Sequence, residues 1–158
     1  MVLSMSNENI YSIFRSRFPL DLSCCWLETD NGVSYSWNDL EQSTARIANL
    51  LFSLDLDPHS RVAAHVDKSP EALMLYLATL RAGFIYLPLN TAYRQGEMSY
   101  FLHNASPAVV VCSPNNYTWI AEIAGKSGVK YIFTLEGMEC GNGAVLKLKT
   151  LTMILFRC

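Results

Sequence analysis

The sequence predicts an α/β fold, in which helices flank a mostly parallel sheet and an antiparallel hairpin comes first. From about residue 36 onward, amphipathic helical patterns alternate with short apolar runs. Before that point, the turn signal Asp30-Asn31-Gly32 separates two short strand-like segments. With 51% hydrophobic and only 16% charged residues, the 158-residue chain can bury the core of one domain.

The first part of the chain predicts a short helix followed by the hairpin. Ser6 or Asn7 can cap a helix that runs to about Phe18, where Pro19 stops it. The inward side chains expected there are Ile10 and Phe14, with Tyr11 as a third candidate. Residues 23–28 and 33–35 are the two expected strands of the hairpin.

The next segment predicts a long amphipathic helix. Ser36 and Asp39 resemble a capping box, with Asp39 in place of the usual Glu. Apolar and small side chains then recur at three- and four-residue steps through Trp37, Leu40, Thr44, Ile47, Leu51 and Leu54.

The remaining chain alternates strands and helices. The expected strands are 61–66, 84–87, 108–112 and 129–135, and the expected helices are 71–82, 95–104 and 114–126. Strands separated by helices imply right-handed crossovers and a parallel sheet covered on both faces. The helix 71–82 is apolar almost all round, so we expect it to be buried between layers.

The composition excludes several classes of protein. A net charge of −2 without basic clusters gives no case for nucleic acid or for an anionic membrane surface. No stretch approaches the roughly 18 apolar residues of a membrane helix. We therefore expect a soluble cytoplasmic protein without membrane insertion; the sequence leaves its oligomeric state open.

The cysteines favour reduced, buried thiols over a metal site or a disulfide. Their number is odd, no CxxC spacing occurs, and two of them are adjacent in sequence. They are Cys24, Cys25, Cys112, Cys140 and Cys158.

The histidines are isolated in sequence, and no metal site is expected. His65 lies inside a strand, where we expect a hydrogen-bonded core or edge histidine rather than a base or a ligand. His59 follows a proline in a loop, and His103 lies near a helix C-terminus, where a protonated ring complements the dipole.

The sequence changes character after Glu136. Residues 137–143 contain three glycines, and an apolar segment that is interrupted by lysines follows. We therefore expect residues 1–136 to form one structural unit and residues 137–158 to be a divergent tail.

Known catalytic motifs are missing from the sequence. There is no GxxxxGK[ST], no GxGxxG after a strand, no GxSxG and no HExxH. No catalytic residue is assigned on this basis.

The stretch 80–93 offers the best candidates for a ligand cleft. Pro88 turns the chain out at the carboxyl end of an expected strand, where ligands gather in open α/β sheets. Asn90, Thr91, Tyr93 and Arg94 are therefore candidates for lining a cleft. Asn and Thr are also ordinary loop formers, and this alternative stays open.

Residues 68–93 carry a family resemblance. KSPEALMLYLATLRAG (68–83) and YLPLNTAY (86–93) resemble the N-terminal region of adenylate-forming (AMP-binding) acyl-CoA synthetases, and most closely that of bacterial malonyl-CoA synthetases. VSYSWNDL (33–40) and ASPAVVVC (105–112) resemble two further segments of that family in the same order. The resemblance covers residues 7–135 and implies that the chain is a partial N-terminal subdomain of the adenylate-forming fold.

The resemblance also implies an activity in fatty acid metabolism. Family members activate a carboxylate with ATP to an acyl-adenylate and then form the CoA thioester, with Mg²⁺ assisting. The Ser/Thr/Gly-rich phosphate loop and the catalytic lysine of the family have no counterpart in this sequence. We therefore expect a truncated acyl-CoA synthetase that is inactive alone and binds ATP, CoA and Mg²⁺ poorly; the alternative is a non-catalytic α/β binding module.

Overall fold

The computed structural model describes residues 9–136 and 149–150. The helices are α1 (Ile10–Arg15), α2 (Trp37–Ser53), α3 (Pro70–Arg81), α4 (Gln95–Ala105), the short 3₁₀ turn η1 (Pro114–Asn116) and α5 (Tyr117–Lys126). The strands are β1 (Cys25–Glu28), β2 (Ser34–Ser36), β3 (Arg61–His65), β4 (Ile85–Pro88), β5 (Val109–Cys112), β6 (Tyr131–Thr134) and β7 (Lys149–Thr150).

The main sheet has the strand order β4-β3-β5-β6-β7. The β3–β4, β3–β5 and β5–β6 pairs are parallel, and β7 runs antiparallel to β6. This confirms the expected α/β fold with a mostly parallel sheet. Strand β3 is central to it, because it pairs with β4 on one side and with β5 on the other.

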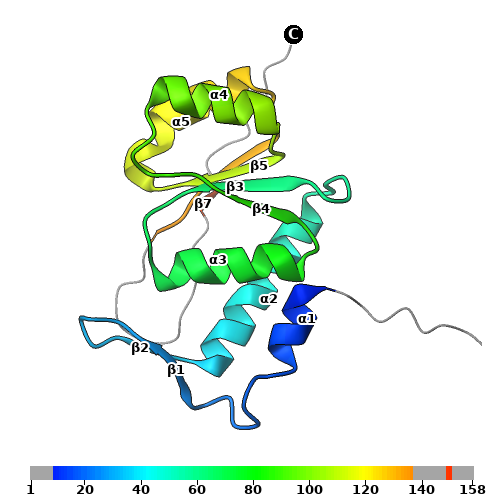
Figure 1. Ribbon diagram of the computed structural model, residues 1–158, viewed down its shortest axis with the longest axis vertical. Coiled ribbons are helices and arrows are strands. Elements are labelled where there is room, and N and C mark those ends of the chain that lie inside the picture. Colours follow the sequence, from blue (N-terminus) through cyan, green and yellow to red (C-terminus); the bar gives the residue numbers. More distant parts are fainter. Residues whose placement is uncertain (1–8, 137–148, 151–158) are drawn as a thin grey trace, which may run out of the picture.

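The sheet is the middle of three layers (Figure 1). Helix α3 lies against one face, with α2 and α1 beyond it, and α4 and α5 cover the opposite face. Two hydrophobic clusters match these layers. The cluster on the α3 side includes Leu40, Ile47, Met74, Leu75 and Val62. The cluster on the α4 and α5 side includes Ala63, Met98, Leu102, Val110 and Ile120.

The predicted hairpin and capping box are both present. Strands β1 and β2 are antiparallel, with Leu27 opposite Tyr35. Ser36 then starts α2: its hydroxyl oxygen accepts from the Asp39 N–H at 3.1 Å, and its own N–H donates to Asp39 Oδ2 at 2.8 Å. The aspartate therefore serves in place of the more common glutamate of the motif.

Helix α3 lies between the sheet and α2, as its apolar sequence predicts. Met74, Leu75 and Ala78 are fully buried, and only Leu73 among its leucines is clearly exposed. After the helix ends, Gly83 adopts a φ of +75°, a conformation that costs a side-chain-bearing residue free energy. The turn delivers the chain directly into β4.

The prediction for α1 was wrong in both ends of the helix and in the inward position of Ile10 and Phe14, whereas the burial of Tyr11 is confirmed. Asn9 caps the helix, and Tyr11 is buried at 6% exposure, whereas Ile10 and Phe14 are 47% and 41% exposed. The hydroxyl of Tyr11 reaches buried polar groups on α2. In a helix of six residues, such tertiary contacts outweigh the apolar periodicity.

None of the helices in the described part of the chain has the length and apolar character to cross a membrane.

We expect Ser36→Ala to lower the free energy of unfolding by about 1 kcal/mol, because α2 loses the acceptor for an N–H group in its first turn. Urea unfolding of the 158-residue chain, followed by circular dichroism, measures the change. Ser53→Ala is the matched control, since its hydroxyl only donates to the Leu50 carbonyl at the far end of the same helix. Equal stability of the two variants would contradict the role given to the cap.

Candidate functional site

The carboxyl edge of the sheet is the candidate site. Strands β3, β4, β5 and β6 are parallel, so all four end there. The chain leaves β3 through α3 on one face and leaves β5 through α5 on the other, so the direction of winding reverses between these two strands. Ligands of open α/β sheets gather at such a switch point.

Three polar side chains end the strands at this edge. His65 pairs in register with Cys112, and Cys112 pairs with Thr134. All three are 0–1% exposed. Register partners on parallel strands point to the same face, and Cys112 belongs to the cluster beneath α4 and α5. We call these three residues the polar row.

Two members of the polar row, His65 and Thr134, lack side-chain hydrogen-bond partners within the described residues. Neither ring nitrogen of His65 is hydrogen-bonded, and the hydroxyl of Thr134 is not either. The expected burial of His65 is confirmed, but its expected hydrogen bond is wrong. Instead, the imidazole meets the Trp119 ring edge-on at 5.7 Å, so an aromatic contact takes the place of a polar one.

Burial disfavours the charged forms of His65 and Cys112. It lowers the pKa of His65, an effect that backbone groups of His65 and Tyr93 and the charge of Asp67 only partly offset. Burial also raises the pKa of the Cys112 thiol to about 12. A thiol with that pKa yields almost no thiolate at neutral pH, so His65 and Cys112 do not form an activated nucleophile and base.

The other cysteines divide between exposed and undescribed positions. Cys24 and Cys25 are free thiols, but they are exposed, contrary to the expectation of burial. Cys24 directly precedes β1 and Cys25 is its first residue, so both lie at the start of a two-stranded hairpin. Cys140 and Cys158 lie outside the described residues.

The four cleft candidates lie on the loop between β4 and α4, beside the end of β3. The side-chain oxygen of Asn90 accepts from the Ala92 N–H at 2.9 Å, and its carbonyl accepts from the Tyr93 N–H at 3.0 Å. The Arg94 N–H donates to Glu97 at 2.7 Å at the start of α4. Asn90, Thr91 and Arg94 are exposed.

Tyr93 is the most buried of these candidates. Its ring is half-buried and stacks on Phe101 with centroids 4.9 Å apart. The side chain of Asn90 stabilises the turn, and the ring of Tyr93 packs on Phe101, so both residues have a structural role. The side chains of Thr91 and Arg94 lie at the surface. A cleft-lining role for the four residues stays a prediction.

Sequence reasoning missed a charged network at the other end of α3. Glu41 of α2 accepts from Arg15 Nε at 2.8 Å and from Arg81 Nη1 at 3.0 Å. The Tyr11 hydroxyl donates to Glu41 at 3.2 Å. Because these residues belong to three separate helices, no local spacing in the sequence could have revealed the network.

A metal site is not apparent in the part of the chain that the structure describes. No group of three or more His, Cys, Asp or Glu side chains there could hold a metal ion.

Comparison with known proteins gives a family match and relatives that are CoA ligases. The family model described as "AMP-binding enzyme" matches residues 16–147. A crotonobetaine/carnitine–CoA ligase of Escherichia fergusonii is 30% identical over 98 residues, which cover 61% of this chain and 19% of the ligase.

Solved structures are also similar to this chain. ATP-bound MatB from Rhodopseudomonas palustris is 42% identical, with a TM-score of 0.74, over 80% of this chain and 25% of MatB. The anthranilate CoA ligase AuaEII, in complex with anthranoyl-AMP, has a TM-score of 0.71 over 78% of this chain and 24% of its own, but at 18% identity it supports the fold alone.

The chain therefore spans about a fifth of the curated relatives and about a quarter of the similar structures. The family match extends past the predicted boundary at residue 136. The proposed divergent tail lies almost wholly outside the described residues, so that boundary stays a prediction.

The stability of the chain should fall as the pH drops below 6.5, the ordinary pKa of histidine. The unfolded chain binds a proton there, whereas folded His65, with its lowered pKa, resists one. The contribution of His65 is therefore complete above pH 6.5 and is lost as the pH falls through the folded-state pKa. Urea unfolding from about pH 8 to about pH 5 measures this dependence.

Two variants isolate the effect. His65→Leu should remove this part of the pH dependence, so its stability relative to the native chain should improve as the pH falls. His103→Gln, at an exposed position on α4, should retain it. Parallel curves for the native chain and H65L would show that His65 does not resist protonation.

Proposed function

The chain belongs to the AMP-binding enzyme family, and from that premise we propose that it supplies the N-terminal part of an acyl-CoA synthetase acting on malonate. In the proposed reaction, a carboxylate oxygen attacks the α-phosphate of ATP and pyrophosphate leaves. The CoA thiol then attacks the acyl carbon and AMP leaves. The observation that carries the proposal is the 42% identity to ATP-bound MatB over 80% of this chain.

The malonate assignment rests on the sequence of residues 68–93. These residues form α3, the Gly83 turn, β4 and the loop beyond it, which together bring the chain to the carboxyl edge of the sheet. The amino-acid sequence of this stretch resembles that of malonyl-CoA synthetases more closely than that of other acyl-CoA synthetases.

In this proposal the chain acts as scaffold and as one wall of the site. The polar row is buried, and its thiol has a raised pKa, so the proposal assigns it no catalytic role. The exposed loop residues Asn90, Thr91 and Arg94, together with Tyr93, would border the space in which the acid and the nucleotide meet. The proposal assigns no described residue to Mg²⁺, since no group of three or more potential ligands occurs among them.

A cytoplasmic location is part of the proposal. Cys24 and Cys25 are exposed and unpaired, and exposed thiols persist in the reducing cytosol.

We expect the 158-residue chain to be inactive alone, because the phosphate-binding loop that the family resemblance calls for is missing from its sequence. Purified chain incubated with ATP, Mg²⁺, malonate and CoA should release neither AMP nor pyrophosphate above background. Whole MatB, assayed in parallel, is the reference. Clear turnover by the chain would overturn this expectation.

A chimera tests whether the chain is part of an enzyme. Residues 16–136 of this chain would replace the matching segment of MatB, which is similar enough in backbone to accept them. The chimera should be soluble and should release AMP in a CoA-dependent manner, at no less than about a hundredth of the MatB rate. A folded chimera without activity would favour the alternative, a non-catalytic binding module.

A further inference from the structure

An open groove of about 520 Å³ lies between α1, the beginning of α2 and the end of α3. It is lined by side chains that carry polar or charged groups, namely Asn9, Tyr11, Ser12, Arg15, Ser16, Glu41 and Arg81. Figure 1 shows α1 beside α2 and beneath one end of α3. Arg81 precedes the turn into β4, so the groove lies toward the amino end of the sheet rather than the carboxyl edge.

Arg81 is held in place through one of its three guanidinium nitrogens. Nη1 donates to the Tyr11 hydroxyl at 2.9 Å, to Glu41 Oε1 at 3.0 Å and to the Thr44 hydroxyl at 3.2 Å. The guanidinium also lies over the Tyr11 ring, 5.0 Å from its centroid. The Nε and Nη2 groups make no such bond within the described residues, so they remain available as donors.

Arg15 is held in a similar way from the other side of the groove. Its Nε contacts Glu41 Oε2 at 2.8 Å, and its guanidinium lies 5.1 Å from the centroid of the Phe18 ring. Its two Nη groups make no hydrogen bond within the described residues. The groove therefore contains two fixed guanidinium groups against one carboxylate, which leaves one positive charge.

These features fit an oxyanion. Guanidinium groups bind phosphate through parallel N–H···O bonds, and groups fixed beforehand lose little side-chain entropy when the ligand arrives. A volume near 520 Å³ exceeds what one inorganic phosphate fills and lies in the range of small organic ligands.

We propose that this groove is a binding site for a small organic phosphate, with the free N–H groups of Arg15 and Arg81 holding the phosphoryl oxygens. The site goes beyond the proposed function, because it lies away from the edge of the sheet at which the carboxylate and nucleotide are expected to react. Binding would clamp α1 onto α2 and α3, since the ligand would join all three helices.

Thermal unfolding of the 158-residue chain tests the proposal with AMP as the organic phosphate, inorganic phosphate as the bare ion, and KCl at matched ionic strength as the salt control. AMP should raise the melting temperature in a saturable manner, at lower concentrations than phosphate, while KCl should not. Equal effects of AMP and phosphate would reduce the groove to an ion site and overturn the organic-phosphate assignment. A shift no larger than that of KCl would overturn the site itself.

Two variants locate the site. Arg15→Gln should weaken AMP binding by at least about tenfold, because it removes two free donors and the net charge of the groove while leaving the Arg81 contacts in place. Arg46→Gln makes the same charge change on the exposed side of α2, outside the groove, and should bind AMP like the native chain. Unchanged AMP affinity in R15Q would place the binding elsewhere and refute the proposal.

Discussion

The pairing of β3 with both β4 and β5 is the constraint on which the rest of this structure depends. A strand with neighbours on both edges and layers on both faces admits only side chains that can be buried. Val62, Ala63 and Ala64 meet that requirement, and they alternate between the two hydrophobic clusters. Because β3 is fully enclosed, the helices on its two faces are held in a fixed relation to each other.

The enclosure of β3 is energetically unfavourable at His65, whose side chain is polar. His65 is the last residue of the strand, at the carboxyl edge, and neither of its buried ring nitrogens has a hydrogen-bond partner in the part of the chain that the structure describes. Native proteins rarely leave buried polar groups unsatisfied, and each case lowers stability. Cys112 and Thr134 occupy the same level on neighbouring strands, so a polar layer closes the core exactly where the loops of the candidate site begin.

Local chemistry explains which features the sequence could predict. The capping box of Ser36 and Asp39, the hairpin turn and the strand of β5 each depend on a few neighbouring residues, and each was predicted correctly. The exposed side of α1 and the network of Arg15, Glu41 and Arg81 depend on contacts between helices far apart in sequence. The same is true of His65, whose lack of partners follows from what surrounds it and not from its place in a strand.

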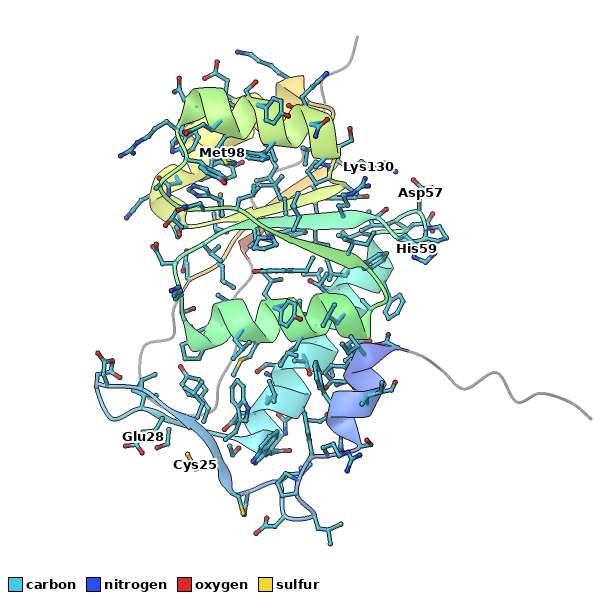
Figure 2. The ribbon with its side chains drawn as sticks, viewed as in Figure 1. Cys25, Glu28, Asp57, His59, Met98 and Lys130 are labelled. Carbon is cyan, nitrogen blue, oxygen red and sulfur yellow. The ribbon has the colours of Figure 1, made fainter. Side chains whose placement is uncertain are left out.

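Glu41 links three helices, a role that its position in the sequence does not suggest. It joins α1 and α3 to α2 through two arginines, on the side of α3 away from the sheet. Figure 2 shows other charged residues, such as Asp57 and Lys130, at the periphery of the molecule, where their 3.3 Å ion pair is open to solvent. The carboxylate of Glu41 is less exposed than that of Asp57 and contacts two arginines instead of one lysine.

The strand order also constrains how the chain is made. Strand β5 inserts beside β3 only after α3, β4 and α4 have all been synthesised, because these elements separate the two strands in sequence. While the ribosome adds them, the edge of β3 that later pairs with β5 is open, and its apolar face toward α4 and α5 is uncovered. Exposed apolar surface and unpaired strand edges favour mispairing, so β3 is vulnerable until residues 109–112 have been made.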